Sequence, residues 1–399
     1  MNFNEIEKLD SAYVMHTYAR NPVAIDHGHG ATVYDTEGRS YVDFTSGIGV
    51  MSLGYGNKDV AKAVYEQALK LTHMSNLYYT EPCVRLAEQL CKRAGMKYVF
   101  FGNSGAEANE GMIKTARKYS FDRYGKGRST VITLKQSFHG RTITTLKATG
   151  QEHFHDFFYP FTEGFEYATP GDIGEIKGLI KNGDVCAVMI ELIQGEGGVF
   201  VLPQDYVREL RKLCDENDIL LLIDEVQTGI GRTGALFAYQ KYGIKPDICS
   251  FAKGIAAGLP MGGFLVNDKC ADVMGYGDHG STFGGNPLSS VAALCVLSAL
   301  DDEFLNQVSE KGQYIREKIS SFNSACVKDV RGDGLMAGIE LCGASNACVA
   351  KEARENGLLC LTAGANVVRL LPPLVISYDE IDKGLKILKK VFEILMNKT

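Results

Sequence analysis

The stretch Ile219-Leu220-Leu221-Leu222-Ile223-Asp224-Glu225-Val226-Gln227 decides the fold. Its first five residues are all apolar and branched, which is typical of a strand buried on both faces of a parallel sheet. In open α/β sheets, ligands bind beyond the carboxyl ends of the strands, so Asp224 stands where an acid that contacts a ligand is expected. The stretch therefore predicts an α/β protein with a mostly parallel sheet.

The next strand-like run, residues 248–252, ends at Lys253, and glycines and alanines surround this lysine. Small neighbours let another molecule approach the amine closely. An amine and an acid on neighbouring strand ends suit pyridoxal phosphate chemistry: the amine links covalently to the cofactor, and the acid keeps the pyridine nitrogen protonated. The alternative from these two stretches alone is that Asp224 caps the following segment and Lys253 is a solvated loop cation.

Length and composition limit the class of protein. At 399 residues the chain exceeds what one core usually supports, so two domains are expected. A net charge of −6 without basic runs favours neither nucleic acid nor an anionic membrane as a partner. Eleven cysteines without a CxxC pair, and no signal-like or membrane-length apolar run, predict a cytoplasmic protein with reduced thiols. No metal site is expected; His27 and His29 lack a third ligand and are predicted to lie in a loop.

The pattern of elements divides the chain into three segments. Residues 1–50 hold a predicted hairpin, with two β-rich runs around a polar turn at 35–39. Residues 51–303 alternate helices with buried strands, as a large α/β domain does, and residues 304–399 resemble a smaller α+β domain that packs with the N-terminal segment. Helices are predicted at about 58–71, 81–94, 204–218, 288–300, 304–322, 345–356 and 379–396.

A further site candidate lies where a short strand at 98–101 turns into a helix that runs to about Tyr119. Gly105 and Ala106 leave the first N–H groups of this helix open to an anion such as phosphate. A plain helix start capped by Ser104 or Asn103 is the alternative.

Three other stretches carry candidate ligands. Phe138 and Arg141 end a strand and could supply a stacking ring and a carboxylate clamp, although they could equally be a core residue and a surface cation. Glu196 lies among glycines and suits either a functional role or a structural ion pair. Arg369 interrupts an otherwise apolar strand, and such an arginine is usually paired with an acid.

The run Gly229-Ile230-Gly231-Arg232-Thr233-Gly234 matches the GxGxxG pattern of dinucleotide-binding proteins. That pattern requires its first glycine directly after the strand and a helix behind it. Here Asp224 to Thr228 intervene, and the run that follows is short, so dinucleotide binding is not predicted.

Together and in this order, the motifs resemble those of the class III (ornithine-type) aminotransferases, over nearly the full chain. The matching motifs are Asn-Ser-Gly-Ala-Glu-Ala-Asn (103–109), Phe-His-Gly-Arg (138–141), Gln-Gly-Glu-Gly-Gly (194–198), Asp-Glu-Val-Gln-Thr-Gly (224–229), Ala-Lys-Gly (252–254), Ser-Thr-Phe-Gly-Gly-Asn-Pro (281–287) and Val-Val-Arg-Leu-Leu-Pro-Pro (367–373). The resemblance implies fold type I, pyridoxal 5′-phosphate as cofactor, and a homodimer with active sites at the subunit interface. Leu192, where the family usually has proline, and Gly254, where alanine is commoner, are departures that loosen only the substrate assignment.

Carried over by position, Lys253 forms the covalent link to the cofactor, Asp224 partners the pyridine nitrogen and Gln227 contacts the phenolic oxygen. Phe138 stacks on the ring, and Thr282 reaches the phosphate of the other subunit's cofactor. The other cofactor contacts that the resemblance implies are Ser104, Gly105 and Ala106 at the phosphate, with Glu225 and Val226.

The resemblance also implies the substrate contacts. Arg141 holds the α-carboxylate of the amino donor, Arg369 holds that of 2-oxoglutarate, and Ser281 lies near the substrate. Glu196 acts as a gate that pairs with Arg369 while the donor is bound. The implied donor is N-acetylornithine, in arginine biosynthesis, with ornithine, succinylornithine, 4-aminobutyrate and succinyl-diaminopimelate as alternatives. An aminomutase is less favoured, because mutases of this fold carry another residue at the position of Gln227.

Overall fold

A computed structural model describes residues 1–397. The helices are α1 Phe3–Tyr13, α2 Ser46–Gly49, α3 Lys58–Lys70, α4 Glu81–Ala94, α5 Gly105–Tyr124, α6 Ile143–Ala148, α7 Ile173–Ile180, α8 Gln204–Glu216, α9 Tyr239–Tyr242, α10 Pro287–Ala299, α11 Asp302–Ser320, α12 Asn346–Glu355 and α13 Tyr378–Asn397. The seven helices predicted by range are confirmed to within two residues at each end. Helix α5 continues five residues past the predicted end at Tyr119.

The large sheet has seven strands in the order β4-β12-β11-β10-β7-β5-β6. Neighbours from β11 to β6 are parallel, and β12 alone runs antiparallel to both of its neighbours. The predicted α/β fold with a mostly parallel sheet is therefore confirmed. The strands are β4 Tyr98–Gly102, β5 Thr130–Leu134, β6 Phe165–Ala168, β7 Val185–Ile190, β10 Leu220–Asp224, β11 Ile248–Phe251 and β12 Gly262–Val266.

Strand β10 lies near the middle of this sheet and is buried on both faces. Leu220 and Leu222 belong to the apolar cluster that includes Met112 and Ile113 of α5. Leu221 and Ile223 belong to the cluster on the other face, which includes apolar residues of α4 and α8. Because strand side chains alternate between faces, Asp224 emerges on the α5 side, at the carboxyl end of the strand.

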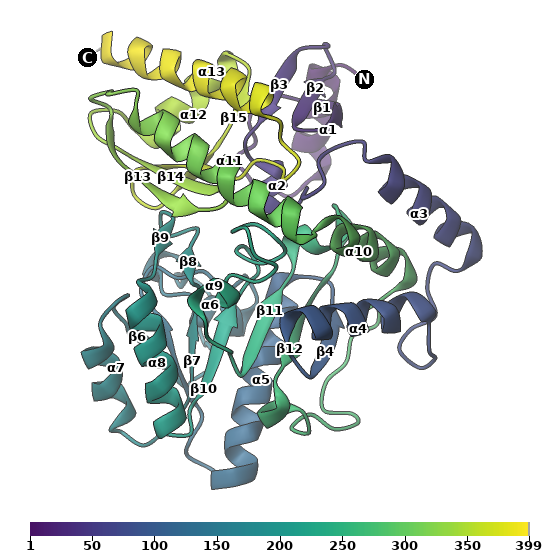
Figure 1. The fold of residues 1–399 in the computed structure, drawn as a ribbon, viewed down its shortest axis with the longest axis vertical. Helices are drawn as coiled ribbons and strands as arrows, with labels where there is room; N and C mark the ends of the chain where they lie inside the picture. The colour runs from purple at the N-terminus through teal and green to yellow at the C-terminus, as the bar shows by residue number, and fades with distance from the viewer. Residues whose placement is uncertain (398–399) are drawn as a thin grey trace.

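The C-terminal part of the chain forms a second sheet, β13-β14-β17-β16, which α11 and α12 contact, while α13 packs against these two helices and against β3 and β15. A third sheet, β1-β2-β3-β15, combines three N-terminal strands with the C-terminal strand β15, and Leu358 pairs with Val42. In Figure 1 the N-terminal strands and the C-terminal helices lie side by side, above the large sheet. The division at residues 50/51 and 303/304 stays a prediction. The strands are β1 Ile25–His29, β2 Thr32–Asp35, β3 Ser40–Asp43, β8 Ile193–Gln194, β9 Phe200–Val201, β13 Val327–Asp333, β14 Met336–Leu341, β15 Leu358–Leu359, β16 Leu361–Ala363 and β17 Val367–Leu370.

The predicted N-terminal hairpin is confirmed, since β2 and β3 pair antiparallel with Tyr34 opposite Ser40. The prediction that His27 and His29 lie in a loop is wrong. Both histidines belong to β1, which pairs with β2 through His29 and Thr32. This strand is exposed along most of its length, so it lacks the apolar alternation by which strands are recognised.

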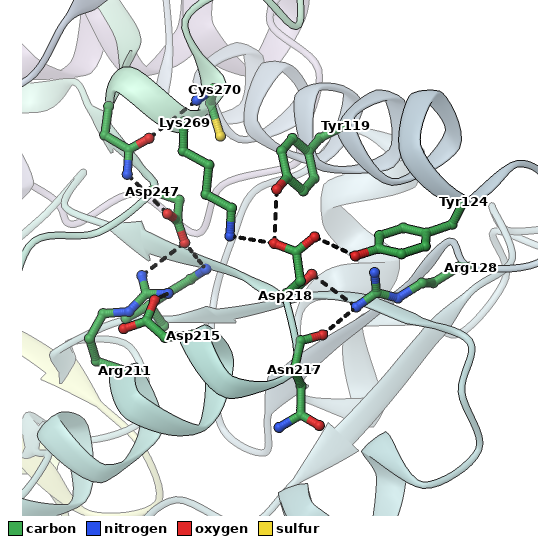
Figure 2. A network of polar contacts seen from close by, with 12 residues as sticks. Tyr119, Tyr124, Arg128, Arg211, Asp215, Asn217, Asp218, Asp247, Lys269 and Cys270 are labelled. Carbon is green, nitrogen blue, oxygen red and sulfur yellow. Dashed lines mark hydrogen bonds and ion pairs between the residues drawn. The ribbon is translucent and has the colours of Figure 1, made fainter.

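A polar network fixes the opposite, amino-terminal end of β10 (Figure 2). The Asp218 carboxylate accepts hydrogen bonds from Tyr119 (2.9 Å) and Tyr124 and pairs with Lys269 (2.7 Å). Arg211 pairs in the same region with Asp247 at 2.8 Å. These contacts hold the amino-terminal ends of the central strands, away from the predicted site. Within residues 1–397, no helix has the length and apolar content needed to cross a membrane.

Candidate active site

A cavity of about 440 Å³ opens at the carboxyl ends of the parallel strands, where a ligand of an α/β sheet is expected. Asp224, which ends β10, and Lys253, which follows β11, both line it. The acid and the amine are thus brought to one cavity. The other predicted residues along its wall are Ser104, Gly105, Ala106, Phe138, Arg141, Val226 and Gln227.

Asp224 is buried and accepts hydrogen bonds on both carboxylate oxygens. Oδ2 lies 2.7 Å from Nδ2 of Asn109 and 2.8 Å from Nδ1 of His139. Oδ1 accepts from the Val226 amide at 3.0 Å and the Ser250 hydroxyl at 3.2 Å. Burial alone would raise the pKa of Asp224, but the contact with His139 and the other hydrogen bonds outweigh it and lower the pKa. The carboxylate therefore stays ionised in its enclosed position.

Lys253 sits in an unusual backbone conformation, with φ at 46° in the left-handed region. A side chain there is strained, and such strain is concentrated at functional sites. Burial lowers the pKa of the Lys253 amine, which favours the neutral, nucleophilic form. The next residue is also held in place, because its carbonyl accepts from the Ser52 hydroxyl at 2.9 Å.

The start of α5 forms one wall of the cavity, with Ser104 as the N-cap residue. The first amides of a helix have no intrahelical acceptor, so this wall offers N–H groups to an anion. Gly105 packs tightly here, since an added Cβ would lie 2.7 Å from Cγ1 of Val226. A side chain at this position would push against Val226, which lies two residues after the end of β10.

Phe138 and Arg141 reach the cavity from the loop after β5. The Arg141 guanidinium lies over two rings, 4.2 Å from the ring centre of Phe154 and 5.5 Å from that of Phe138. Arg141 is exposed, and the two aromatic rings orient its cation. Its placement suits a clamp for a substrate carboxylate at the cavity mouth.

Arg369 and Glu196 form an ion pair of 2.6 Å between Nη1 and Oε1. The same Nη1 donates to Oε1 of Gln227 at 3.0 Å. Gly195 permits this approach, because an added Cβ would lie 2.1 Å from Oε1 of Gln227. Burial would raise the pKa of Glu196, but Arg369 outweighs it and lowers the pKa. Gln227 thus links the cavity to the ion pair.

Five predicted residues do not line the cavity. Glu196 and Arg369 reach it only through Gln227, and the other three are Glu225, Ser281 and Thr282. The Glu225 side chain is buried away from it, where it accepts from the Thr228 hydroxyl at 2.6 Å and the Tyr239 amide at 2.8 Å. A side-chain contact between Glu225 and the cofactor is therefore not supported; successive strand residues face opposite sides, and its neighbour Asp224 takes the cavity side. Ser281 lies just outside and contacts Asn103 at 3.2 Å, while Thr282 is exposed.

Three residues of this site, Asn109, His139 and Glu191, were given no role by the sequence analysis. The first two contact Asp224, and each keeps one buried polar atom without a hydrogen-bond partner among the described residues (Asn109 Oδ1 and His139 Nε2). Glu191 follows β7, lines the cavity and accepts from the Phe138 amide at 2.9 Å. Burial and the nearby Asp224 charge raise the pKa of Glu191 well above its usual range. Its position directly after a buried strand was the available signal.

Pyridoxal phosphate fits this set of residues. A lysine can bond its aldehyde, an ionised acid can hold its ring nitrogen, an aromatic ring can stack on it, and a helix start can receive its phosphate. The fold and site together define a pyridoxal phosphate-dependent enzyme of fold type I.

Comparisons with known proteins agree. The family model for class III aminotransferases matches residues 13–392, and the chain belongs to this family. Acetylornithine aminotransferase of Haemophilus ducreyi is 51% identical over 98% of this chain and 99% of its own length. The enzyme of the same name from Caldanaerobacter subterraneus is 46% identical over 96% and 98%.

Two solved structures extend the comparison. Ornithine aminotransferase of Toxoplasma gondii superposes with a TM-score of 0.96 at 32% identity, over 100% of this chain and 97% of the other. N-acetylornithine aminotransferase of Stenotrophomonas maltophilia gives 0.85 at 34% identity, over 98% and 100%. The chain is a pyridoxal phosphate-dependent aminotransferase.

Proposed function

We propose that this enzyme transfers the terminal amino group of N2-acetyl-L-ornithine to 2-oxoglutarate, giving N-acetylglutamate 5-semialdehyde and glutamate, in arginine biosynthesis. The observation that carries the proposal is the identity of 41–51% to several enzymes named acetylornithine aminotransferase, each over 96–98% of this chain. The site adds a chemical reason. Arg141 at its mouth forms no ion pair with the described residues and is open to a donor carboxylate, whereas Arg369 is paired with Glu196.

Bound pyridoxal phosphate supplies an electron-withdrawing ring that stabilises negative charge on the substrate carbon. Lys253 would hold the cofactor through its Nζ. Once free of that bond, the same Nζ would be placed to accept the proton of the substrate carbon and to return it. The lowered pKa of Lys253 leaves a larger fraction of this amine neutral and able to accept that proton. Asp224, held by Asn109 and His139, would keep the ring nitrogen of the cofactor protonated.

Two differently charged substrates use the same cavity in turn. We assign Arg141 to the α-carboxylate of the amino donor and Arg369 to that of 2-oxoglutarate. While the donor is bound, Glu196 neutralises Arg369, as in the 2.6 Å ion pair. When 2-oxoglutarate arrives, its carboxylate replaces that of Glu196. A buried guanidinium is thus charge-compensated in both halves of the reaction.

A panel of amino donors with 2-oxoglutarate tests the assignment. N-acetylornithine is expected to give the highest kcat/KM, ahead of ornithine, succinylornithine, succinyl-diaminopimelate and 4-aminobutyrate. Equal or higher kcat/KM for ornithine would make the enzyme an ornithine aminotransferase instead. A product that is an isomer of the donor, formed without 2-oxoglutarate, would indicate an aminomutase.

We also infer that the enzyme works as a homodimer in the cytoplasm. Large apolar side chains are exposed around α3, the segment that follows it and the loop near Thr282; patches of this kind mark protein interfaces. They are Tyr65, Leu69, Leu77, Tyr78, Tyr79 and Phe283, with exposures from 59% to 99%. In a dimer through this surface, Thr282 would be free to reach the partner's cofactor. Sedimentation of the native enzyme and of a Leu77→Asp variant tests this, because the variant is expected to dissociate.

A further inference from the structure

Arg232 is an arginine enclosed in the glycine-rich loop that follows β10. Only 2% of it is exposed, and it is the largest of the fully buried side chains in the described part of the chain. Nη1 donates to the carbonyl oxygens of Leu335, at 3.0 Å, and Pro372, and Nη2 lies 3.4 Å from the Ser46 hydroxyl. All three acceptors are uncharged. Among the described residues no carboxylate contacts the guanidinium directly, and Asp43 offsets its charge only from a distance. Keeping such a charge costs free energy and calls for an explanation.

The acceptors belong to segments that meet at one end of the strand pair β14–β17. Leu335 precedes β14 and Pro372 follows β17, and between them Gly338 pairs with Arg369. The contact is reciprocal, because the Arg232 carbonyl accepts from the Leu335 amide at 3.0 Å. The Arg232 guanidinium therefore binds the end of the β14–β17 strand pair, where its acceptor Pro372 lies three residues after Arg369.

Ser46 connects this cap to the cavity wall. Its hydroxyl donates to the Leu371 carbonyl at 2.6 Å, and its own φ is 43°. The three following residues also have positive φ, including Ile48 at 66°, so the chain makes one left-handed turn before Val50. A branched residue in this conformation is strained, and contacts from outside must hold the turn. Val50 itself lines the cavity.

We propose that Arg232 is a positioning residue that fixes the end of β17 against the left-handed turn and so sets the place of Arg369 relative to Lys253. The segment 224–232 then positions groups on both the cofactor side and the Arg369 side of the site. Asp224 serves the cofactor, Gln227 holds the Arg369 side chain, and Arg232 holds the backbone beside it. The inference rests on the proposed function, in which Arg369 binds the carboxylate of 2-oxoglutarate.

The test compares Arg232→Lys, loaded with pyridoxal phosphate, with the wild type in separate single-turnover half-reactions. A lysine keeps the charge but cannot span three acceptors in the planar geometry of a guanidinium. We expect kcat/KM for 2-oxoglutarate to fall about 10- to 100-fold, mainly through KM, because small displacements of a binding group cost about this much. The amino-donor half-reaction, in which Arg369 stays paired with Glu196, is expected to change less than about threefold.

Arg211→Lys is the matched control. Arg211 is also largely enclosed, with 12% of its side chain exposed. It pairs with Asp247 at the amino-terminal ends of the strands, away from the cavity (Figure 2). This variant is expected to lower Tm without changing the ratio of the two half-reactions. Ser46→Ala is a second probe for the case in which Arg232→Lys fails to fold. This variant is expected to lower kcat/KM for 2-oxoglutarate about 2- to 10-fold through the loss of one hydrogen bond. The donor half-reaction should again change little.

An equal loss in both half-reactions would overturn the proposal, as would a folded Arg232→Lys enzyme that is unstable but binds 2-oxoglutarate normally. The glutamate and 2-oxoglutarate half-reaction does not depend on which amine the enzyme uses. A wrong amino donor would therefore appear in the wild-type donor panel, separately from any failure of the Arg232 assignment.

Discussion

Replacing Glu196 by glutamine removes the charge that faces Arg369 while keeping the size of the side chain. The pair is short, 2.6 Å, and Arg369 has only 3% of its side chain exposed, against 31% for Glu196. In the variant, the buried guanidinium is left without a carboxylate whenever the amino donor occupies the cavity. It is compensated again when glutamate or 2-oxoglutarate brings its own carboxylate. The substitution should therefore act on one half-reaction and not on the other.

The magnitude follows from the kind of contact. Hydrogen bonds between charged groups contribute about 1.5–3 kcal/mol. At about 1.4 kcal/mol per factor of ten, the ratio of kcat/KM for the amino donor to kcat/KM for glutamate is expected to fall roughly 10- to 100-fold. Most of this change should appear as a higher kcat/KM for glutamate, because its carboxylate no longer has to displace Glu196, whereas the ion pair is present both in the free enzyme and in the donor complex.

Single-turnover measurements of each half-reaction, followed by the absorbance of the bound cofactor, give the two values separately. Glu209→Gln serves as the control, since Glu209 pairs with Lys177 at 2.7 Å on the surface, with about half of each side chain exposed. A surface pair of this kind contributes little, so neither half-reaction should change. An equal decrease for the amino donor and for glutamate in Glu196→Gln would refute the gate.

Four other outcomes are expected. Lys253→Ala should lower turnover by at least about 10⁴-fold while the purified protein still binds cofactor, and normal transamination in that variant would contradict its role. Asp224→Asn should lower kcat about 10²- to 10³-fold, because an amide cannot keep the ring nitrogen protonated; steady-state rates with circular dichroism as a folding control test this. Gly105→Ala should weaken cofactor binding about tenfold in a titration, since the new Cβ would lie 2.7 Å from Val226, whereas unchanged affinity would show that the wall can yield. Asp218→Asn should lower Tm at pH 7 but not at acid pH. Burial would raise the pKa of Asp218, yet its hydrogen bonds to a lysine and two tyrosines lower it, so its stabilisation is present above about pH 4 and disappears as pH falls further.

The fold was predictable where the signal is local. Five apolar residues before Asp224 indicate a strand buried on both faces, and β10 has that burial. Amphipathic periods gave the seven helices predicted by range to within two residues. Strand β1 was missed because it is an exposed strand with a polar composition, and its pairing with β2 depends on a partner and not on its own pattern. The antiparallel direction of β12 likewise has no local signature, since its five buried residues look like those of any central strand.

The same distinction between local signals and long-range contacts applies to the site residues. An apolar strand that ends in an acid or an amine indicates a functional position. Asp224 and Lys253 were predicted for this reason. Which polar group lies beside which depends on the order of the strands, and strand order is set by topology. Asn109 and His139 contact Asp224 from 115 and 85 residues away in the sequence, and no spacing rule connects such distances. The same holds for Arg232, which lay within a glycine pattern that was set aside because it did not fit a dinucleotide site. Once the chain is folded, this arginine proves to be buried against the strand of Arg369. The glycine pattern at 229–234 does not indicate a dinucleotide site, but it does contain the arginine that holds distant segments of the chain together.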